Sequence, residues 1–362
     1  MPQLQGVGYG QAAAQLCRGV SVPEAGMLEA GVTEAGVATC VAWAALYAAI
    51  GYVGTWLARR YAVRHRLIDQ PGERRSHTVA TPRGGGIAIV AAVLVAIAWL
   101  ILRNPEHAPL LAAFAIGLVL VAGIGWADDH QPTSPWWRLA VQAIAALLLT
   151  WGVWHEGGGV QAAGCAFVAA MVLVNVWNFM DGIDGLAASQ AMIVALAYGV
   201  SAGHGMVTSL GFALAAACLG FLPFNLPKAR IFLGDVGSGA LGYSLAALAS
   251  WLALQDWDRA PALLLPLSAF GIDASLTLAM RIARRQRWWL PHTEHGYQHW
   301  ARRISGHGAV TFAYAGWTVA ASMLMLVASP AGAAFMMASL LATGVAGMAA
   351  WAWLRRTTRR TG

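Results

Sequence analysis

Long apolar runs recur along most of the chain, and their length is that of a membrane-spanning helix. A helix needs about 20 mainly apolar residues to cross a bilayer, and eleven stretches approach this length. They cover residues 37–58, 84–102, 108–126, 136–154, 160–179, 186–202, 207–224, 236–254, 261–281, 310–329 and 332–354. Charged residues make up only 11% of the chain, against about 25% in soluble domains. Because the alternation of barrel strands is not seen, we predict an all-α polytopic membrane protein with about 11 transmembrane helices.

The basic residues fall almost entirely on one side of the predicted membrane. Twenty of the 23 Lys and Arg lie in or beside alternate loops, and the other side holds only Arg18, Arg103 and Arg259. The positive-inside rule places the basic loops in the cytosol. This puts the N-terminus outside and the C-terminus in the cytosol. Topology therefore explains the net charge of +7, and we expect a lipid bilayer, and no nucleic acid, as partner.

The remaining sequence suggests one transmembrane domain over residues 36–354. Residues 1–35 are polar to neutral and are predicted to form a poorly ordered external extension, unless translation starts at Met27. Residues 355–362 form a basic cytosolic tail. The predicted external loops are short, whereas the cytosolic loops are longer and contain the unusual polar residues. The working face is therefore expected to be cytosolic.

Carboxylates gather on this predicted face. Six of the sixteen Asp and Glu residues reach it: Asp128, Asp129, Asp181, Asp184, Asp235 and Asp273. Carboxylates that converge take up protons unless a cation offsets their repulsion. Oxygen ligands of this kind suit Mg²⁺, which commonly uses one or two carboxylates together with phosphate oxygens and water. The sequence therefore predicts a Mg²⁺ site, for which Mn²⁺ could substitute.

Each acidic stretch also has a purely structural interpretation. Asp128 and Asp129 could form a solvated helix end, and Asp235 could cap the eighth span. Asn178 and Asp181 could form the turn between two helices. These roles are compatible with metal or substrate binding at the same residues.

Asp273 lies within the ninth predicted span. Asp273, Thr277 and Arg281 recur at i, i+4 and i+8, so they share one helical face. This spacing turns Asp273 inward, where it either braces the helix bundle or binds substrate.

Two cytosolic loops supply basic and polar groups for phosphate. The loop RRSHTVATPRGGG, residues 74–86, places Arg83 before three glycines, and backbone amides at a helix start attract phosphate. The loop RQRWWLPHTEHGYQHWARR, residues 285–303, contains His292, His295 and Gln298. Without nearby thiolates or a carboxylate pair, phosphate or nucleotide binding fits this loop better than zinc. Acids and bases together predict chemistry on a phosphorylated substrate.

Five stretches, in order from Arg74 to Arg303, resemble the polyprenyl-phosphate N-acetylhexosamine-1-phosphate transferases. They are the glycine-rich loop, the Asp-Asp pair, NVWNFMDGIDGL, IFLGDVGSGALGY and HTEHGYQ. The loop PHTEHGYQH looks most like the O-antigen-initiating branch, which uses UDP-linked deoxy-N-acetylhexosamines such as FucNAc or QuiNAc. Glu294 departs from that pattern. The histidine-rich loop of the muramyl-pentapeptide branch is absent in its usual form.

The resemblance implies a role for each matching residue. Asp128 and Asp129 match the acidic pair associated with Mg²⁺ and with activation of the lipid phosphate, and Asp235 matches the metal-binding aspartate. Two further sets match substrate-binding segments: Asn178, Asp181 and Asp184 at the uridine nucleotide, and His292, His295 and Gln298 at the nucleotide-sugar. Arg83 is expected to bind substrate phosphate.

These implications amount to one expected reaction at the bacterial inner membrane. A sugar-1-phosphate is transferred from a UDP-N-acetyl-sugar to undecaprenyl phosphate, UMP is released, and O-antigen or a related envelope glycan is started. We prefer direct attack by the lipid phosphate over a covalent phospho-aspartate on Asp128. The alternatives are a secondary transporter of an anionic metabolite, a CDP-alcohol phosphotransferase, and the phospho-MurNAc-pentapeptide branch. The oligomeric state is open, with a homodimer as one option.

Overall fold

The computed structural model describes residues 34–70, 79–287, 289–290, 292–304 and 306–358. Nearly all of the predicted extension, part of the loop at 74–86 and the last residues of the tail lie outside this part of the chain.

Each of the eleven predicted spans contains an apolar helix, and most helix ends lie within a few residues of the expected ones. These are α2 (Glu34–Arg64), α3 (Ile87–Arg103), α4 (Ala108–His130), α5 (Pro135–His155), α6 (Gly159–Phe179), α7 (Leu186–Ala202), α8 (Met206–Asn225), α9 (Asp235–Gln255), α10 (Ser268–Ala283), α12 (His307–Ala328) and α13 (Ala333–Thr358). In the described chain, eight helices are long and apolar enough to cross a membrane. The protein is an all-α polytopic membrane protein, as predicted.

The ninth predicted span is not one continuous helix, contrary to the expectation. A 3-10 helix, η2 (Trp257–Leu264), precedes α10, and the two are bent by 68°. Pro266 lies at the break, where its missing N–H and restricted backbone disfavour continuing the helix. Counted as one broken span, this pair gives a ninth crossing; α3 and α7 are shorter, with 17 residues each.

Short elements connect some of the long helices. A 3-10 turn, η1 (Pro105–His107), joins α3 to α4, and the short helix α11 (Gly296–Ile304) lies between α10 and α12. Strands β1 (Ile68–Asp69) and β2 (Thr81–Pro82) pair antiparallel, with Ile68 opposite Pro82 and Asp69 opposite Thr81. This two-residue ribbon is a local departure from the all-α class.

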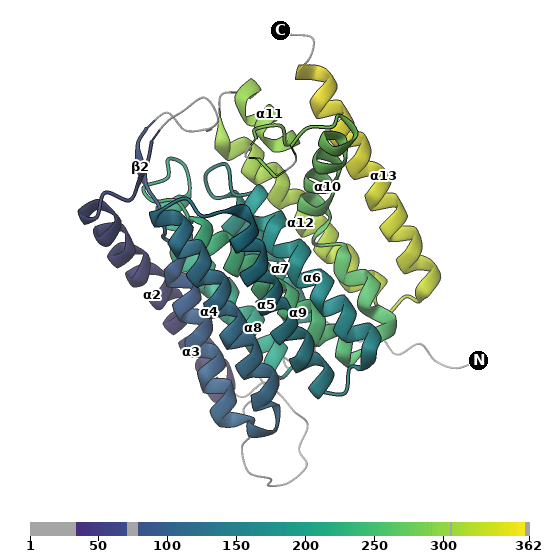
Figure 1. The fold of residues 1–362 in the computed structure, drawn as a ribbon. Coiled ribbons are helices and arrows are strands. Elements are labelled where there is room, and N and C mark those ends of the chain that lie inside the picture. Colours follow the sequence, from purple (N-terminus) through teal and green to yellow (C-terminus); the bar gives the residue numbers. More distant parts are fainter. Residues whose placement is uncertain (1–33, 71–78, 288, 291, 305, 359–362) are drawn as a thin grey trace, which may run out of the picture.

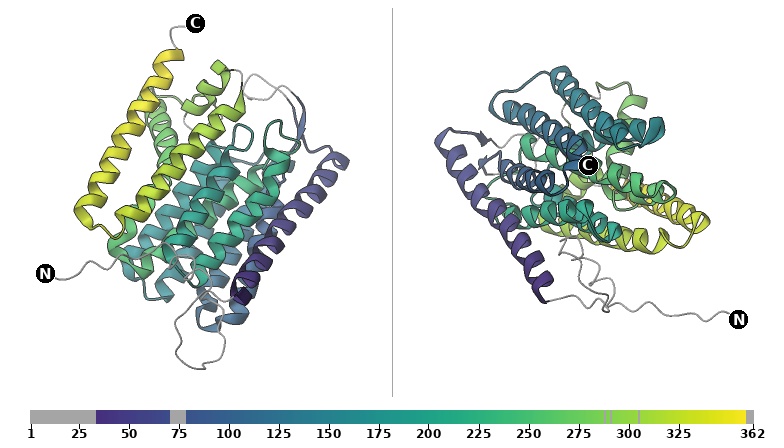
Figure 2. Two further views of the ribbon diagram at one scale, coloured as in Figure 1. Left: turned by 180° about the vertical axis from the view of Figure 1, so that it is seen from behind. Right: turned by 90° about the horizontal axis from the view of Figure 1, so that it is seen from below.

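Helix α9 forms the centre of the bundle. In its most apolar window 94% of residues are buried, and its sequence DVGSGALGYSLAALASW is rich in the small residues that let helices approach closely. A Cβ added at Gly242 would collide with the backbone of α6 at Leu173. By contrast, α2 and α13 lie on opposite flanks (Figures 1 and 2) and are only 17% buried. They expose large apolar side chains such as Leu57 and Leu341, which suits contact with lipid.

One end of the bundle brings together the segments singled out in the sequence. The C-terminal ends of α4, α6 and α8 and the N-terminal ends of α5, α7 and α9 all lie there, beside β2 and α11 (Figure 1). Because successive helices run in opposite directions, residues far apart in the sequence meet at this end.

Candidate active site

Asp129 joins the end of α4 to the start of α9. Its side chain is 2% exposed. Its Oδ1 accepts a hydrogen bond from the Asp235 backbone amide at 3.1 Å, and its Oδ2 accepts one from the Val236 amide at 3.2 Å. These are amides of the first turn of α9, which have no partner inside the helix. Asp129 therefore caps α9 from another helix, and both carboxylate oxygens are engaged in doing so.

Two neighbours make this cap possible. Gly234 has a φ of +78°, a left-handed conformation that favours glycine, and a Cβ there would collide with Asp129 Oδ2. Arg83 donates to the Asp129 backbone carbonyl, and its Nε lies 3.7 Å from Asp129 Oδ1. The guanidinium of Arg83 offsets the buried negative charge.

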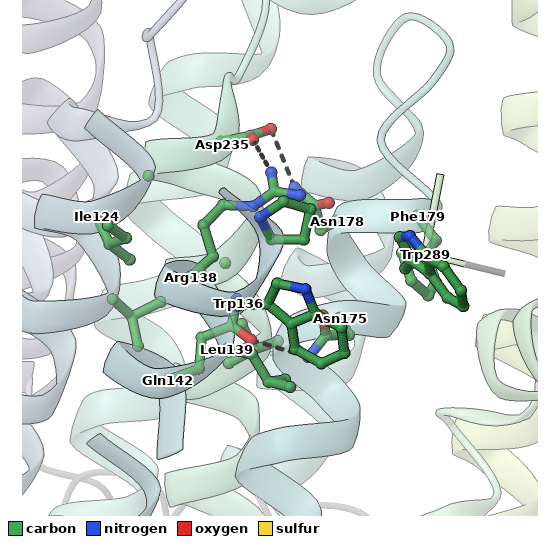
Figure 3. A pocket seen from close by; sticks show the side chains of 15 residues that line it. Ile124, Trp136, Arg138, Leu139, Gln142, Asn175, Asn178, Phe179, Asp235 and Trp289 are labelled. Carbon is green, nitrogen blue, oxygen red and sulfur yellow. Dashed lines mark hydrogen bonds and ion pairs between the residues drawn. The ribbon is translucent and has the colours of Figure 1, made fainter. Parts of the chain in front are cut away.

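Asp235 is the first residue of α9 but is not its cap, contrary to one of the sequence interpretations. The cap position is occupied by Gly234, which has no side chain to cap the helix. The Asp235 carboxylate points away from the helix start: Oδ1 accepts from Asn178 Nδ2 at 3.0 Å, and Oδ2 accepts from Arg138 Nη1 at 3.0 Å. Figure 3 shows both side chains reaching Asp235, Arg138 from α5 and Asn178 from α6.

Arg138 also contacts Asp128, which makes it a bridge between two carboxylates. Its Nη1 lies 2.9 Å from Asp128 Oδ2. The other oxygen of Asp128 accepts from the Thr133 amide and from Thr133 Oγ1, each at 2.6 Å. Asp128 is thus held by three donor groups and is not a free, solvated helix end. The cation that the clustered acids require is, in part, Arg138, which sequence reasoning counted only as a topology-setting charge.

A polar cavity of about 210 Å³ opens beside this cluster. The predicted residues that line it are Arg83, Asp129, Asp181, Asp184, Asp235 and Gln298. Asp69, Asn225 and His307 also line it and were not predicted. Six of the predicted site residues, drawn from five separate stretches of sequence, therefore share one cavity.

Asp181 is partly buried and stands out among these residues because its carboxylate has no hydrogen-bond or ion-pair partner in the described chain. Burial raises the pKa of Asp181 well above its ordinary value, and the negative charges of Asp235, Asp129 and Asp184 raise it further. An unpartnered carboxylate facing three others is costly unless a cation or a proton joins it.

Asp184, the other acid of the same segment, is fully engaged. Its Oδ2 accepts from the Ala229 amide at 3.1 Å, and its Oδ1 lies 3.1 Å from His307 Nδ1. Thr311 Oγ1 donates to the Asp184 carbonyl at 2.8 Å. Asp184 thereby ties the start of α7 to the start of α12. His307 gave no signal in the sequence: it lies three residues before the tenth predicted span, 310–329, and is the first residue of α12.

The donor set fits a hard divalent cation that brings other ligands with it. In the described residues, no three Asp, Glu, His or Cys side chains are arranged to hold a metal ion by themselves. The Asp181 carboxylate has no partner among the described residues, and of the three acids that raise its pKa, Asp235 has the largest effect. Two carboxylates completed by phosphate oxygens and water are a common environment for Mg²⁺.

A second, mostly apolar pocket of about 90 Å³ also has Asp235 in its lining (Figure 3). Arg138, Asn178 and Asp235 line it together with apolar side chains of α4, α5 and α6. Deeper in this pocket, Asn175 Nδ2 donates to Gln142 Oε1 at 3.0 Å. Because Asp235 lines both pockets, it stands between an apolar space and a polar one.

The predicted histidines lie apart from the polar cavity. His295 is 3% exposed, and its Nδ1 is 3.8 Å from Asp273 Oδ1. The His292 ring lies 4.8 Å from that of His295. Burial lowers the pKa of His292 to about 4, with the adjacent His295 and Arg281 acting in the same direction. A neutral imidazole can hydrogen-bond a phosphate but cannot attract it by charge.

The glycine triplet serves packing, contrary to the expectation of a phosphate cradle. The amides of Gly85 and Gly86 donate to the carbonyls of Phe232 and Leu233 at 2.9 and 2.8 Å. Two of the three expected donors are therefore used within the protein. A Cβ at Gly86 would collide with the Gly237 backbone of α9, so this glycine is needed where α3 and α9 cross.

Comparison with known proteins assigns the family. The profile described as glycosyl transferase family 4 matches residues 111–253. A phospho-N-acetylmuramoyl-pentapeptide-transferase of Heliobacterium modesticaldum is 32% identical over 240 residues, which cover 57% of this chain and 73% of that protein. The chain belongs to glycosyl transferase family 4. The resemblance to polyprenyl-phosphate N-acetylhexosamine-1-phosphate transferases is thus confirmed.

Other family members are similar over a comparable region. A decaprenyl-phosphate N-acetylglucosaminephosphotransferase of Mycobacterium tuberculosis is 36% identical over 236 residues, or 57% of this chain and 58% of that protein. A probable undecaprenyl-phosphate N-acetylglucosaminyl 1-phosphate transferase of Bacillus subtilis is 27% identical over 259 residues, or 67% and 71%. The chain thus spans less than two thirds of the length of the mycobacterial relative.

Proposed function

We propose that this family 4 protein transfers an N-acetylhexosamine-1-phosphate from a UDP-sugar to a polyprenyl phosphate, releasing UMP. The observation that carries the proposal is the position of Asp235, which lines both a mostly apolar pocket and a polar cavity lined by acids and Arg83. The hydrocarbon chain of a lipid phosphate suits the apolar pocket, whereas a nucleotide diphosphate suits the polar cavity. The names of the relatives, which refer to polyprenyl phosphate and to the transfer of a sugar phosphate, support the same reaction.

In this reaction an oxygen of the lipid phosphate attacks the β-phosphorus of the UDP-sugar. The bond between that phosphorus and the oxygen bridging to the α-phosphorus breaks, and UMP leaves with that oxygen. Arg138 lies where it can attract the incoming lipid phosphate, and Arg83 where it can attract the diphosphate. Since both substrates are anionic, positioning and electrostatic stabilisation by these cations supply much of the rate.

Asp128 orients rather than attacks in this scheme. Three donor groups occupy its oxygens at 2.6 to 2.9 Å, which reduces their nucleophilicity. The lipid phosphate has a second pKa near 6, so it arrives largely deprotonated at neutral pH and needs little general-base help. Direct attack is therefore favoured over a covalent phospho-aspartate.

Asp181 and Asp235 are the residues we expect to hold Mg²⁺, which Mn²⁺ can replace. Asp129, the metal ligand expected from the resemblance, contributes by holding the start of α9 in place. When bound, the ion neutralises charge on the diphosphate and on the departing UMP. Asn178 supports the site by fixing Asp235 Oδ1.

The basic loops support a cytosolic site in the bacterial inner membrane. Eleven crossings, with α3, α7 and the bent η2–α10 pair each counted once, put the N-terminus outside and the site in the cytosol with the C-terminus. UDP-sugars are made in the cytosol, so this orientation gives the polar cavity access to its substrate.

The identity of the sugar is the finer part of the proposal. The loop PHTEHGYQH favours a UDP-linked deoxy-N-acetylhexosamine and O-antigen initiation, whereas two of the relatives are named for N-acetylglucosamine. Glu294, the departure in this loop, pairs with Arg281 in the structure. It therefore serves the loop's own fold and bears little on the choice of sugar.

Purified protein in proteoliposomes tests the proposal. With undecaprenyl phosphate and a panel of UDP-GlcNAc, UDP-FucNAc and UDP-QuiNAc, we expect UMP release and a lipid-diphosphate-sugar identified by mass spectrometry. Both should stop on chelation of divalent cations and return with added Mg²⁺. Uptake of the nucleotide-sugar without UMP release would instead identify a transporter. Turnover that persists in excess chelator would contradict the Mg²⁺ assignment.

A further inference from the structure

Asp273 makes more hydrogen bonds than a simple helix brace requires. It lies inside α10 and is 3% exposed. Its Oδ1 accepts from the Gly296 amide at 2.7 Å, and its Oδ2 accepts from the Tyr297 amide at 3.0 Å and from Tyr314 Oη at 2.8 Å. The two amides belong to the first residues of α11, which lack partners within that helix. Asp273 is therefore the N-terminal cap of α11, supplied by a different helix.

Helix α11 depends on such contacts for its position. It has nine residues, and helices shorter than about 12 residues are marginal on their own. Its sequence is GYQHWARRI, and its first three residues are buried. The cap from α10 and the hydroxyl of Tyr314 on α12 hold this end of α11 between two long helices.

The start of α11 in turn touches the polar cavity. Gln298 is 7% exposed and lines the cavity. Tyr297 is buried, and its hydroxyl donates to the Phe179 carbonyl at 3.0 Å, two residues before Asp181. A Cβ at Gly182 would collide with that same hydroxyl. The segment containing Asp181 therefore packs directly on the residue that Asp273 holds.

We propose that Asp273 is a positioning residue for nucleotide-sugar binding: by capping α11 it sets Gln298 and, through Tyr297, the segment of Asp181. Asp273 does not line the polar cavity, and its oxygens are occupied by protein donors, so it does not contact the substrate itself. A buried carboxylate in an apolar helix is costly, and an apolar side chain could pack there but could not cap α11. The inference rests on the proposed function for the identity of the ligand.

Asp273→Asn is the primary test. The amide retains one acceptor but turns an NH₂ group toward one of the two α11 amides, leaving a buried donor unsatisfied. We expect KM for the UDP-sugar to rise about 10- to 100-fold, while KM for undecaprenyl phosphate stays within about 2-fold. Tyr297→Phe should also raise KM for the UDP-sugar. In the double variant, the rise in KM should be smaller than the product of the two single rises, because both substitutions disturb the same contacts of α11.

Thr277→Val is the matched control. Thr277 lies one turn from Asp273 on the same helical face, is fully buried and hydrogen-bonds Asp273 and Trp351, but no bond to α11 involves it. A general loss of packing in α10 would affect Thr277→Val as strongly as Asp273→Asn. We expect its KM for the UDP-sugar to remain at the wild-type value. Tyr314→Phe, which spares both amide bonds, should give a smaller rise than Asp273→Asn.

Amide hydrogen exchange separates this inference from the proposed function. In peptides covering residues 292–304, exchange should be faster in Asp273→Asn than in wild type, and unchanged in Thr277→Val. Wild-type protection in Asp273→Asn would overturn the capping role, whether or not the protein transfers sugar phosphate. Faster exchange with an unchanged KM for the UDP-sugar would overturn the positioning role. Failure of the proposed function itself would appear as absence of turnover in wild type.

Discussion

Arg138 bridges Asp128 and Asp235 with contacts of 2.9 and 3.0 Å, and this predicts a specific mutational pattern. Arg138→Ala removes the cation between the carboxylates and, on the proposed function, a binding group for the lipid phosphate, so turnover should fall about 100-fold. Arg138→Lys should recover only part of it, because a single ammonium group cannot reproduce a planar guanidinium bridge.

Steady-state UMP release measures the effect of these changes. Arg284→Ala is the control, because Arg284 is an exposed cation at the C-terminal end of α10. If Arg138→Ala and Arg284→Ala lose activity equally, the effect is one of general surface charge, and the bridge has no special role.

Asp181 predicts a pH-dependent stability. Its folded-state pKa is raised above the ordinary value of 3.8, chiefly by burial, so the folded protein binds more protons than the unfolded chain between these two values. Stability contributed by this group therefore falls as pH rises through that window. Asp181→Asn removes the free-energy cost of a buried negative charge at this position. Without divalent cations, its Tm should exceed that of wild type by about 2–4 °C at neutral pH.

Thermal unfolding in detergent measures this difference. The gap between Asp181→Asn and wild type should narrow as the pH approaches 4, where both forms are uncharged at this position. Added Mg²⁺ should raise the Tm of wild type more than that of Asp181→Asn. A variant less stable than wild type at neutral pH would show that Asp181 has a favourable partner in the folded state.

At the same scale, the sequence predicted which acids converge but not what each one does. Asp128, Asp181 and Asp235 were expected at one site and lie there. Asp129 and Asp184 also lie there, as expected, but their oxygens are engaged by backbone amides and by His307. Such contacts depend on where other helices end, which a one-dimensional pattern does not contain. Arg138 was missed for the same reason, since only the fold brings it between two carboxylates.

Between elements, the crossing of α4 and α9 predicts contrasting effects for two nearby glycines. A Cβ at Gly125 would collide with the backbone of Asp235 and Val236, whereas a Cβ at Gly123 meets nothing within 4 Å. Gly125→Ala must push the start of α9 away, at a cost of about 1–3 kcal/mol. Gly123 is exposed, and Gly123→Ala should stabilise helix α4 by up to about 1 kcal/mol.

Unfolding and turnover assays on the two variants distinguish these outcomes. Gly125→Ala should lose most of its activity, because the displaced α9 moves Asp235 and loosens the Asp129 cap. Gly123→Ala should retain wild-type turnover. Equal stability and turnover of the two variants would show that α4 can shift without disturbing α9, which would contradict the close contact of Gly125 with the start of α9.

Most helix boundaries could be predicted because hydrophobicity and bilayer thickness fix the length of a span. Two features could not. The ninth span is not one straight helix, because η2 and α10 meet at an angle near Pro266. Helix α11 is too short and too polar to be recognised as a separate helix. Helix α11 is ordered by a carboxylate from α10, so its existence depends on a contact between segments more than 20 residues apart.

For the whole molecule, orientation depends on the number of crossings, and α3 and α7 decide that number. Each is a mainly apolar helix of 17 residues, or about 25 Å at 1.5 Å per residue, against a hydrocarbon core of about 30 Å. If both cross, the loop after α6 and the loop after α7 face opposite sides. If α7 lay in the membrane without crossing it, these loops would share a side, and every later loop would change sides.

Single cysteines introduced into a cysteine-free variant test this topology in intact bacterial cells. An impermeant maleimide should label Gly157→Cys and Gly203→Cys, in the turns after α5 and α7, but not Arg284→Cys until the cells are permeabilised. Gly157 and Gly203 have positive φ values of +84° and +73°, so a cysteine adds local backbone strain in these turns, but no atom lies within 4 Å of the added Cβ. Arg284 is exposed. Labelling of Gly157→Cys without Gly203→Cys would mean that α7 does not cross. The basic loops on the two sides of α7 would then face opposite compartments, against the charge asymmetry that orients the rest of the chain.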